Sequence, residues 1–264
     1  MDFDFLKNEF ILSAISGVTK QQLIRLYKDQ FDYTDKDIDK LLKSCNFNKK
    51  PKLINYLNFY NLKIPSSAER LKFPFTQIYI QKGFLSKSEC QEIMTEVDKD
   101  LHPSAVSNPE DRIIVSDYRT SSSCFFDYCS GRTGFELDKK INRYLGFDPF
   151  IGETVQAQKY EPGQYYKEHH DYYDPFSEEY KTYIEWMGQR TWTFMVYLND
   201  VKEGGETYFK HLNMKIKPQA GLAVFWNNLW PFGWTNYKTL HEALPPISGN
   251  KYILTKWYRS WPLL

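Results

Sequence analysis

The sequence has few cysteines, no long apolar run and almost no net charge, and each of these absences excludes a class of protein. Four cysteines in 264 residues, none of them spaced as CxxC, are too few for a disulfide framework. The apolar runs fall far short of the roughly 20 residues that a membrane-spanning helix needs. The 34 Lys and Arg and 33 Asp and Glu leave a net charge of +1, which argues against binding nucleic acid or a membrane surface through bulk charge. Because the acidic start, Met1 to Asp4, has no basic and apolar leader, we expect a soluble, cytoplasmic protein.

Hydrophobic residues make up 42% of the chain, enough for a sizeable core, and their spacing changes near residue 68. Before that point, short apolar segments at helical spacing predict a helical region, residues 1–68, whose role is open. It overlaps a basic stretch, residues 36–72, which is either a solvated helical face or a docking surface for an acidic partner. Residues 69–264 are predicted to form a second, larger domain.

Short strands and turns dominate this larger domain. An alternating segment at 76–80 precedes a helix that starts at a capping box, Ser86 to Glu89, and runs to about Asp100. A second amphipathic helix is predicted over 133–145. The remaining predicted elements are strands, several of them separated by Gly, Pro or Asn turns: 154–160, 191–198, 213–217, 221–226, 237–243 and 251–260. Many short strands with such turns predict a sandwich or barrel, so the expected fold class is α+β with a β core.

The chain has only five histidines, and two of them stand beside an aspartate in His169-His170-Asp171. In an extended segment, residues i and i+2 point to the same side, so His169 and Asp171 would face one point. With a third ligand from a later strand, they would form a 2-His-1-carboxylate triad that leaves three positions of an octahedral Fe(II) open. Alone the tripeptide is a weak signal, because surface histidines beside an acidic residue explain it equally well.

A second cluster lies further along the chain. His241 is followed, ten residues later, by Lys251 at the start of an apolar strand. A lysine buried in a β core is costly unless it is paired, so an interior Lys251 would indicate an anionic ligand. From the alternating pattern alone, a Lys251 that faces solvent is the more ordinary interpretation.

Seven segments in a fixed order give the chain a resemblance to a known family. They are Phe84–Cys90, Tyr118–Ser122, Tyr160–Tyr166 leading into His169-His170-Asp171, Tyr197–Val201, Gly204–Thr207, Lys217–Gly221, and His241 with Lys251 ahead of Thr255–Trp257. Across about residues 76–262 the chain resembles the prolyl 4-hydroxylase-like branch of the Fe(II)/2-oxoglutarate-dependent dioxygenases. The resemblance implies a double-stranded β-helix, or jelly-roll, core with flanking helices.

The resemblance also implies roles for individual residues. His169, Asp171 and His241 match the iron ligands, with His170 pointing away. Lys251 matches the basic residue that pairs with the distal carboxylate of 2-oxoglutarate. Two tyrosines match positions in the cosubstrate pocket, with ordinary core packing as the alternative for both: Tyr160 and Tyr197.

Substrate contacts are expected from four residues: Arg119, Trp257, Tyr173 and Trp230. Arg119 and Trp257 match family positions near the site, although a structural ion pair would explain Arg119 as well. Trp230 belongs to an aromatic segment, 225–234, which is either a packed turn or an apolar platform suited to a proline-bearing peptide. Three side chains just past Asp171 would extend such a platform: Tyr172, Tyr173 and Phe176. Where the family often has Trp after its basic residue, this chain has Tyr252.

We therefore expect an enzyme that hydroxylates a prolyl residue in a peptide or protein and releases succinate and CO2. The resemblance implies Fe(II), with 2-oxoglutarate and O2 as cosubstrates and ascorbate as an optional reductant. The same chemistry on a free amino acid or another small substrate stays open, because fold and triad do not fix the substrate. A non-catalytic jelly-roll binding module is the alternative from another class. The near-neutral charge disfavours a nucleic-acid dealkylase.

Overall fold

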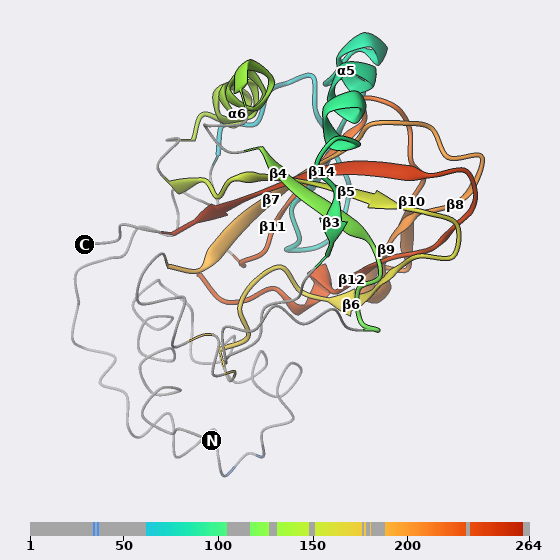
Figure 1. Cartoon of the computed structure of the whole chain (residues 1–264). Helices are drawn as coiled ribbons and strands as arrows, with labels where there is room; N and C mark the ends of the chain where they lie inside the picture. Colours follow the sequence, from blue (N-terminus) through green and yellow to red (C-terminus); the bar gives the residue numbers. More distant parts are fainter. Residues whose placement is uncertain are drawn as a thin grey trace.

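The computed structural model describes residues 62–104, 117–126, 131–147, 151–175, 188–230 and 233–260, together with 34, 36, 177 and 180. Two antiparallel sheets lie over one another, and two helices cover the outer face of the larger sheet (Figure 1). The helical region expected over 1–68 lies almost wholly outside the described residues, so it stays a prediction. Of its last residues, three pack against the core under the helices: Leu62, Ile64 and Ala68.

The larger sheet has eight strands within the described ranges, in the order β1-β2-β11-β7-β14-β5-β4-β3, and every neighbouring pair is antiparallel. Its strands are β1 (Glu69–Arg70), β2 (Ile78–Gln81), β3 (His102–Pro103), β4 (Ser122–Phe126), β5 (Val155–Tyr160), β7 (Arg190–Tyr197), β11 (Ala223–Asn227) and β14 (Lys251–Arg259). Its central strands β7, β14 and β5 are neighbours in space although the chain leaves the sheet between them. Those excursions build the second sheet.

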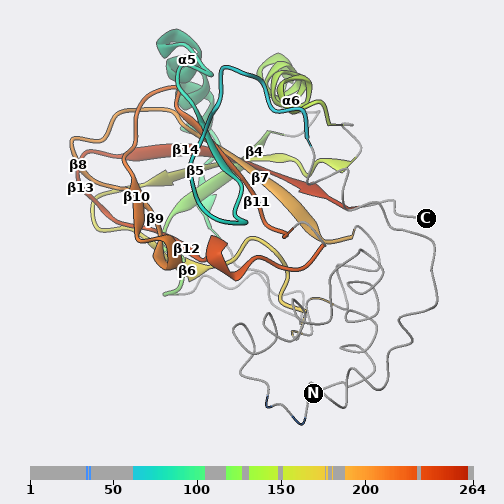
Figure 2. The same ribbon diagram turned by 180° about the vertical axis from the view of Figure 1, so that it is seen from behind.

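The smaller sheet has the order β10-β9-β12-β6 and lies on the side opposite the helices (Figures 1 and 2). Its strands are β6 (Tyr166–His169), β9 (Thr207–Phe209), β10 (Met214–Ile216) and β12 (His241–Ala243). A short pair, β8 (Glu203–Gly204) and β13 (Pro246–Ser248), and two 3₁₀ turns, η2 (Lys210–Leu212) and η3 (Tyr237–Thr239), complete the connections. The predicted α+β class with a β core is confirmed for the described residues, and two antiparallel sheets around one core are consistent with a jelly roll.

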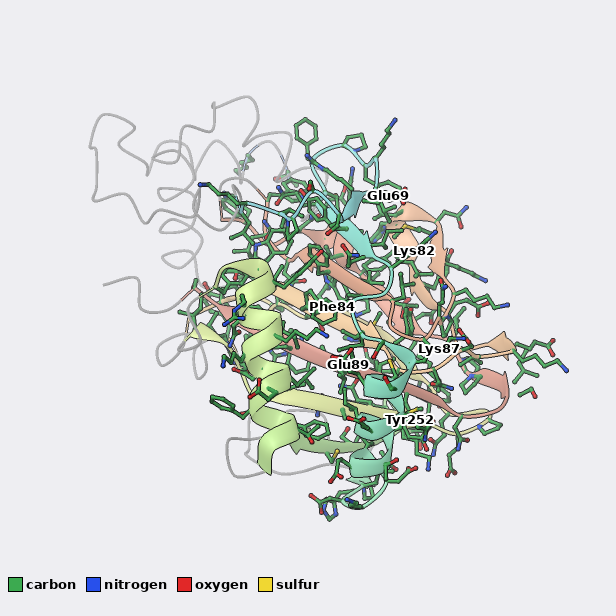
Figure 3. All side chains as sticks on the ribbon, turned by 90° about the horizontal axis from the view of Figure 1, so that it is seen from above. Glu69, Lys82, Phe84, Lys87, Glu89 and Tyr252 are labelled. Atoms are coloured by element: carbon green, nitrogen blue, oxygen red, sulfur yellow. The ribbon has the colours of Figure 1, made fainter. Side chains whose placement is uncertain are left out.

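Two α-helices of the described region pack across the larger sheet, α5 (Lys87–Val97) and α6 (Gly131–Leu145) (Figure 3). The predicted capping box is present at α5, where the Ser86 hydroxyl accepts from the Glu89 amide and the Glu89 carboxylate accepts from the Ser86 amide. Apolar side chains at helical spacing are buried against the sheet: Cys90, Ile93 and Val97 from α5, and Leu137, Ile141 and Leu145 from α6. Because the helices occupy this face, the other face is left for a site between the sheets.

Strand β14 separates two cores. Tyr252, Leu254 and Tyr258 belong to the core under the helices, whereas Ile253 belongs to the core between the sheets. The Tyr252 hydroxyl donates to the Asp98 carboxylate at 2.9 Å, at the end of α5. The departure from the family's Trp therefore lies on the helix side, away from the face that carries Lys251.

Most of the predicted strands are confirmed to within two residues, but the segment 237–243 is not a single strand. It begins as the 3₁₀ turn η3, and β12 starts only at His241. Asn236 causes the difference, because its side chain accepts from the Lys238 amide at 3.1 Å and so favours a turn over an extended strand. Among the described residues, no helix is long and apolar enough to cross a membrane. The cytoplasmic location stays a prediction.

Candidate metal centre and its cavity

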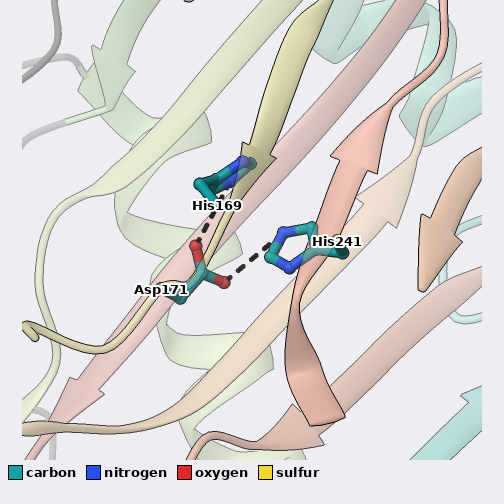
Figure 4. A group of neighbouring side chains, drawn as sticks. All are labelled: His169, Asp171 and His241. Atoms are coloured by element: carbon teal, nitrogen blue, oxygen red, sulfur yellow. Dashed lines mark ion pairs between the residues drawn. The ribbon is translucent and has the colours of Figure 1, made fainter. Parts of the chain in front are cut away.

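The three predicted metal ligands meet at the smaller sheet. His169 ends β6, Asp171 follows two residues later, and His241 opens β12 directly opposite His169. One ligand atom from each lies within 4.8 Å of the others. The Asp171 carboxylate lies 3.8 Å from His169 Nε2 and 4.0 Å from His241 Nε2 (Figure 4). With metal–ligand bonds of roughly 2.1 Å, one ion is within reach of all three after small side-chain adjustments.

Backbone carbonyls fix which nitrogen of each histidine faces this point. His169 Nδ1 lies 2.8 Å from the Lys167 carbonyl oxygen, and His241 Nδ1 lies 2.9 Å from that of Thr239. A carbonyl only accepts, so each Nδ1 carries the proton and each Nε2 keeps its lone pair for a metal. Burial, helped by the neighbouring His241, lowers the pKa of His169 to about 3, so this ring is neutral near pH 7.

Asp171 supplies the negative charge of the group. Its side chain is buried, and the Thr193 hydroxyl donates to Oδ2 at 2.6 Å. Burial alone would raise the pKa of this carboxyl, but the two histidines and the Thr193 hydrogen bond outweigh it and hold the pKa below its usual range. An ionised carboxylate beside two imidazole nitrogens is the donor set of a 2-His-1-carboxylate iron site.

A cavity of about 500 Å³ opens beside the triad, between the two sheets. Strand register explains its lining, because Lys251, Ile253 and Thr255 of β14 stand opposite Tyr160, Gln158 and Gln156 of β5. All of these residues except Lys251 line the cavity. Trp226 and Trp257 line it too, and their indole N–H groups are buried with no hydrogen-bond partner among the described residues. Buried donors without partners are costly, so this cavity suits a ligand rich in acceptor oxygens.

Lys251 is fully buried beside this cavity. Its Nζ has no hydrogen-bond partner in the part of the chain that the structure describes, and it lies 4.9 Å from the Tyr160 ring centre and 5.9 Å from that of Tyr197. Burial lowers the pKa of the amine to about 7, although the negative charge of Glu206 acts to raise it. The interpretation of a solvent-facing Lys251 is therefore wrong, and the orphaned amine fits a ligand carboxylate.

A second buried lysine on the same strand shows that this lack of a partner is particular to Lys251. Lys256 faces the helix side, where its Nζ bonds the Asp138 carboxylate of α6 and the Glu153 carbonyl. The fold thus provides an acidic partner for Lys256, whereas Lys251 has none among the described residues.

The two tyrosines predicted for the cosubstrate pocket differ in position. Tyr160 lines the cavity, and burial raises its pKa, so it remains a protonated donor. Tyr197 is not among the lining residues, and its hydroxyl oxygen lies 2.6 Å from that of Thr207 and 3.1 Å from the Ile216 carbonyl oxygen. Thr207, which accepts this hydrogen bond from Tyr197, lines the cavity in its place; the sequence analysis included Thr207 in the segment Gly204–Thr207 without giving it a role.

Arg119 and Trp257 both line the cavity, and their contact with substrate stays a prediction. Arg119 bonds the hydroxyls of Ser121 and Ser123 at 3.2 and 3.1 Å. The guanidinium of Arg190 lies over the Trp257 ring, 4.0 Å from the ring centre. Arg190 also lines the cavity, is held by the Glu153 carboxylate at 2.6 and 2.7 Å, and was missed by the sequence analysis.

A second cavity, of about 420 Å³, adjoins the triad and carries aromatic side chains: Tyr118, Tyr166, Tyr172 and Tyr173. Tyr173 is thus placed beside the site, with the guanidinium of Arg259 4.7 Å from its ring centre.

Trp230 lines neither cavity; its ring lies 5.7 Å from that of Tyr237. Residues 225–229 are buried, which favours the packed turn over the alternative of an apolar platform, and Phe176 lies outside the described residues. His170 lies beside both cavities, but its Nε2 bonds the Tyr237 carbonyl at 3.1 Å, away from the point that the ligands share.

Comparison with known proteins identifies the family. The model of the "2OG-Fe(II) oxygenase superfamily" matches residues 155–259, which include the triad and Lys251. A protein of Acanthamoeba polyphaga mimivirus that is named as a prolyl 4-hydroxylase is 30% identical over 203 residues, which cover 75% of this chain and 81% of the viral one. The chain belongs to the 2OG-Fe(II) oxygenase superfamily. It is a prolyl 4-hydroxylase-like member, a dioxygenase that depends on Fe(II) and 2-oxoglutarate, as the sequence resemblance predicted.

Other relatives agree with this assignment. An Arabidopsis thaliana protein named as prolyl 4-hydroxylase 3 is 32% identical over 199 residues, which cover 68% of each chain. The viral collagen prolyl hydroxylase of Paramecium bursaria Chlorella virus-1, solved with 2-oxoglutarate, is 29% identical with a TM-score of 0.53, over 68% of this chain and 94% of the viral one. The chain spans only 34% of the Gallus gallus prolyl 4-hydroxylase subunit alpha-1.

Proposed function

We propose that this protein hydroxylates a prolyl residue in a peptide or protein, using Fe(II) held by His169, Asp171 and His241. The observation that carries the proposal is the buried, unpartnered amine of Lys251 beside the cavity that the triad lines, since it fits the distal carboxylate of 2-oxoglutarate. The prolyl substrate is supported by the names of the relatives, which include a collagen prolyl hydroxylase solved with 2-oxoglutarate.

In this proposal, the bound iron and 2-oxoglutarate supply the oxidising chemistry, and the chain supplies binding, orientation and exclusion of water. Lys251 neutralises the distal carboxylate, and Tyr160, whose hydroxyl burial keeps protonated, lines the same cavity. Trp226 and Trp257 line this cavity too, and their buried indole N–H groups have no hydrogen-bond partner among the described residues. The Lys251 amine and the two indole N–H groups have no hydrogen-bond partner among the described residues, so a ligand carboxylate or carbonyl satisfies them at little rearrangement cost.

The tyrosines around the second cavity support a proline-bearing substrate. Tyr166 stacks on His169 with ring centres 3.6 Å apart, and Tyr118 meets Tyr166 edge-on at 6.0 Å. Grooves lined by aromatic rings are a common means of recognising extended, proline-rich segments. We place the peptide along these rings, with Arg119, Trp257 and Tyr173 beside it.

Coupled turnover with a proline-bearing peptide tests this proposal. We expect succinate release to rise on adding proline-rich peptides, and the peptide to gain the mass of one oxygen atom on a prolyl residue, as read by mass spectrometry. A matched peptide with alanine in place of proline serves as the control. Oxygen added to a free amino acid or to alanine with equal efficiency would reject a prolyl residue as the substrate while leaving the dioxygenase itself intact.

The affinity for 2-oxoglutarate is expected to fall as the pH rises above about 7. The free site holds an amine with a pKa of about 7, and a bound carboxylate requires its protonated form. Binding above this pH must therefore take up a proton, so the affinity is full below pH 7 and decreases by up to about tenfold per unit above it. Calorimetric titrations on either side of pH 7 measure the change in affinity, and repeating them in buffers of different ionisation enthalpy measures the proton uptake. In Lys251→Arg, whose guanidinium stays charged, the affinity should be flat over the same range; a flat profile in the unmodified protein would contradict the role of Lys251.

A further inference from the structure

The three proposed metal ligands are held in two different ways. Both histidines are oriented by backbone carbonyls, whereas Asp171 is oriented by a side chain, that of Thr193 on β7. Thr193 is fully buried, and its hydroxyl donates to Asp171 Oδ2 at 2.6 Å. Asn228, also fully buried, places its amide nitrogen 2.9 Å from the same hydroxyl oxygen.

The direction of these two hydrogen bonds follows from the chemistry of the groups. An ionised carboxylate only accepts, so the single proton of the Thr193 hydroxyl must point to Asp171. The hydroxyl oxygen is then left as an acceptor, so Asn228 must present its Nδ2 donor and not its Oδ1. The chain Asn228 to Thr193 to Asp171 is therefore polarised towards the carboxylate, and each bond strengthens the next.

Asn228 is itself fixed by the segment that leads to the third ligand. The backbone carbonyl oxygen of Asn228 accepts from the backbone amide of Asn236 at 2.8 Å. The backbone carbonyl of Asn236 in turn accepts from the Thr239 backbone amide at 3.0 Å and from the Thr239 hydroxyl at 2.8 Å. Thr239 is the residue whose carbonyl orients His241. The segment between β11 and β12 thus orients two ligands. The backbone carbonyl of Thr239 orients His241, and the side chain of Asn228 orients Asp171 through Thr193.

We propose that Thr193, oriented by Asn228, is a positioning residue that engages Oδ2 of Asp171 and leaves Oδ1 to bind the metal. This inference rests on the proposed function only in taking the triad as a metal site. Oδ1 is the oxygen on the His169 side, 3.8 Å from its Nε2 (Figure 4). With Oδ2 engaged, the carboxylate cannot rotate freely, and the metal meets a ligand that is already in place.

Metal affinity without cosubstrate or substrate tests the proposal. Outer-shell partners of metal ligands are typically worth roughly 10- to 100-fold in metal affinity, so Thr193→Val, which removes the hydroxyl and keeps the shape, should weaken anaerobic Fe(II) binding to metal-free protein by about that factor. Thr193→Ser, which restores the hydroxyl, should recover most of it. Thr191→Val is the matched control, because it removes an equally buried threonine hydroxyl from β7 whose partner is the Tyr258 carbonyl.

The measured Fe(II) affinities distinguish a failure of the proposed function from a failure of the positioning role of Thr193. If the unmodified protein binds no Fe(II), the proposed function fails. If it binds Fe(II) and Thr193→Val binds equally well, or loses no more affinity than Thr191→Val, the positioning role is overturned. Should Thr193→Val fail to fold, Asn228→Ala keeps the hydroxyl but removes the group that orients it. Weakened Fe(II) binding in that variant supports the proposal, and unchanged binding rejects it.

Discussion

Replacement of Asp171 by alanine is expected to abolish both turnover and Fe(II) binding while the fold persists. Asp171 is the only carboxylate in the cluster of three ligands that the described residues form, so its loss leaves two imidazoles and no anionic ligand for a divalent ion. The site is buried, and the side-chain hydrogen bond that Asp171 loses is the one from Thr193. Anaerobic titration with Fe(II) and 2-oxoglutarate, followed by the visible absorbance of the chelate, measures binding, and succinate release measures turnover.

The control for this substitution is Asp100→Ala, which removes an exposed carboxylate beside His102 just past α5. It should leave iron binding, turnover and thermal unfolding unchanged. His169→Ala is expected to match Asp171→Ala, because the same ion would lose a nitrogen ligand whose orientation the Lys167 carbonyl fixes. Normal turnover in Asp171→Ala, with the protein folded, would overturn the assignment of the triad.

The triad was predictable because its signal is local. His169 and Asp171 are two residues apart, and a two-residue period in an extended chain is enough to place them on one side. His241 follows from the family order of motifs, and the pairing of β6 with β12 then brings it opposite His169. The helices and most strands were predictable for the same reason, since capping and alternation act over a few residues.

Strand β14 shows why the position of Lys251 could not be settled from the sequence. The strand is covered by helices on one face and by the smaller sheet on the other, so both of its faces are buried and the alternation of polar and apolar residues is lost. The choice between a packed turn and an apolar platform for 225–234 was open for the same reason. The aromatic start of this segment belongs to β11, another strand buried on both faces, and not to an exposed loop.

The residues around the triad escaped prediction because their roles depend on contacts between distant segments. Thr193 and Asn228 lie 22 and 57 positions beyond Asp171, and neither residue type marks a metal site by itself. The same holds for Arg190, which is held by Glu153 from the segment ahead of β5. Only the order of the strands in the two sheets brings these groups together.

Replacement of Lys251 by methionine is expected to have opposite effects on cosubstrate binding and on stability. Loss of a buried charge contact typically costs roughly 2–5 kcal/mol, so the 2-oxoglutarate requirement should rise by about 30-fold to several thousand-fold. The ligand-free protein should gain stability, because the amine has no hydrogen-bond partner among the described residues and its lowered pKa reports the cost of burying its charge. Titration of 2-oxoglutarate into the iron-loaded protein and thermal unfolding of the metal-free protein measure the two effects separately.

Lys256→Met is the matched control on the same strand, and it should lower stability without changing cosubstrate binding. It leaves the Asp138 carboxylate of α6 without its ion-pair partner, so unfolding should occur at a lower temperature while the 2-oxoglutarate requirement stays unchanged. If Lys251→Met instead lost stability and kept its cosubstrate affinity, the buried amine would be a structural group like Lys256, and another donor of the cavity would have to hold the distal carboxylate.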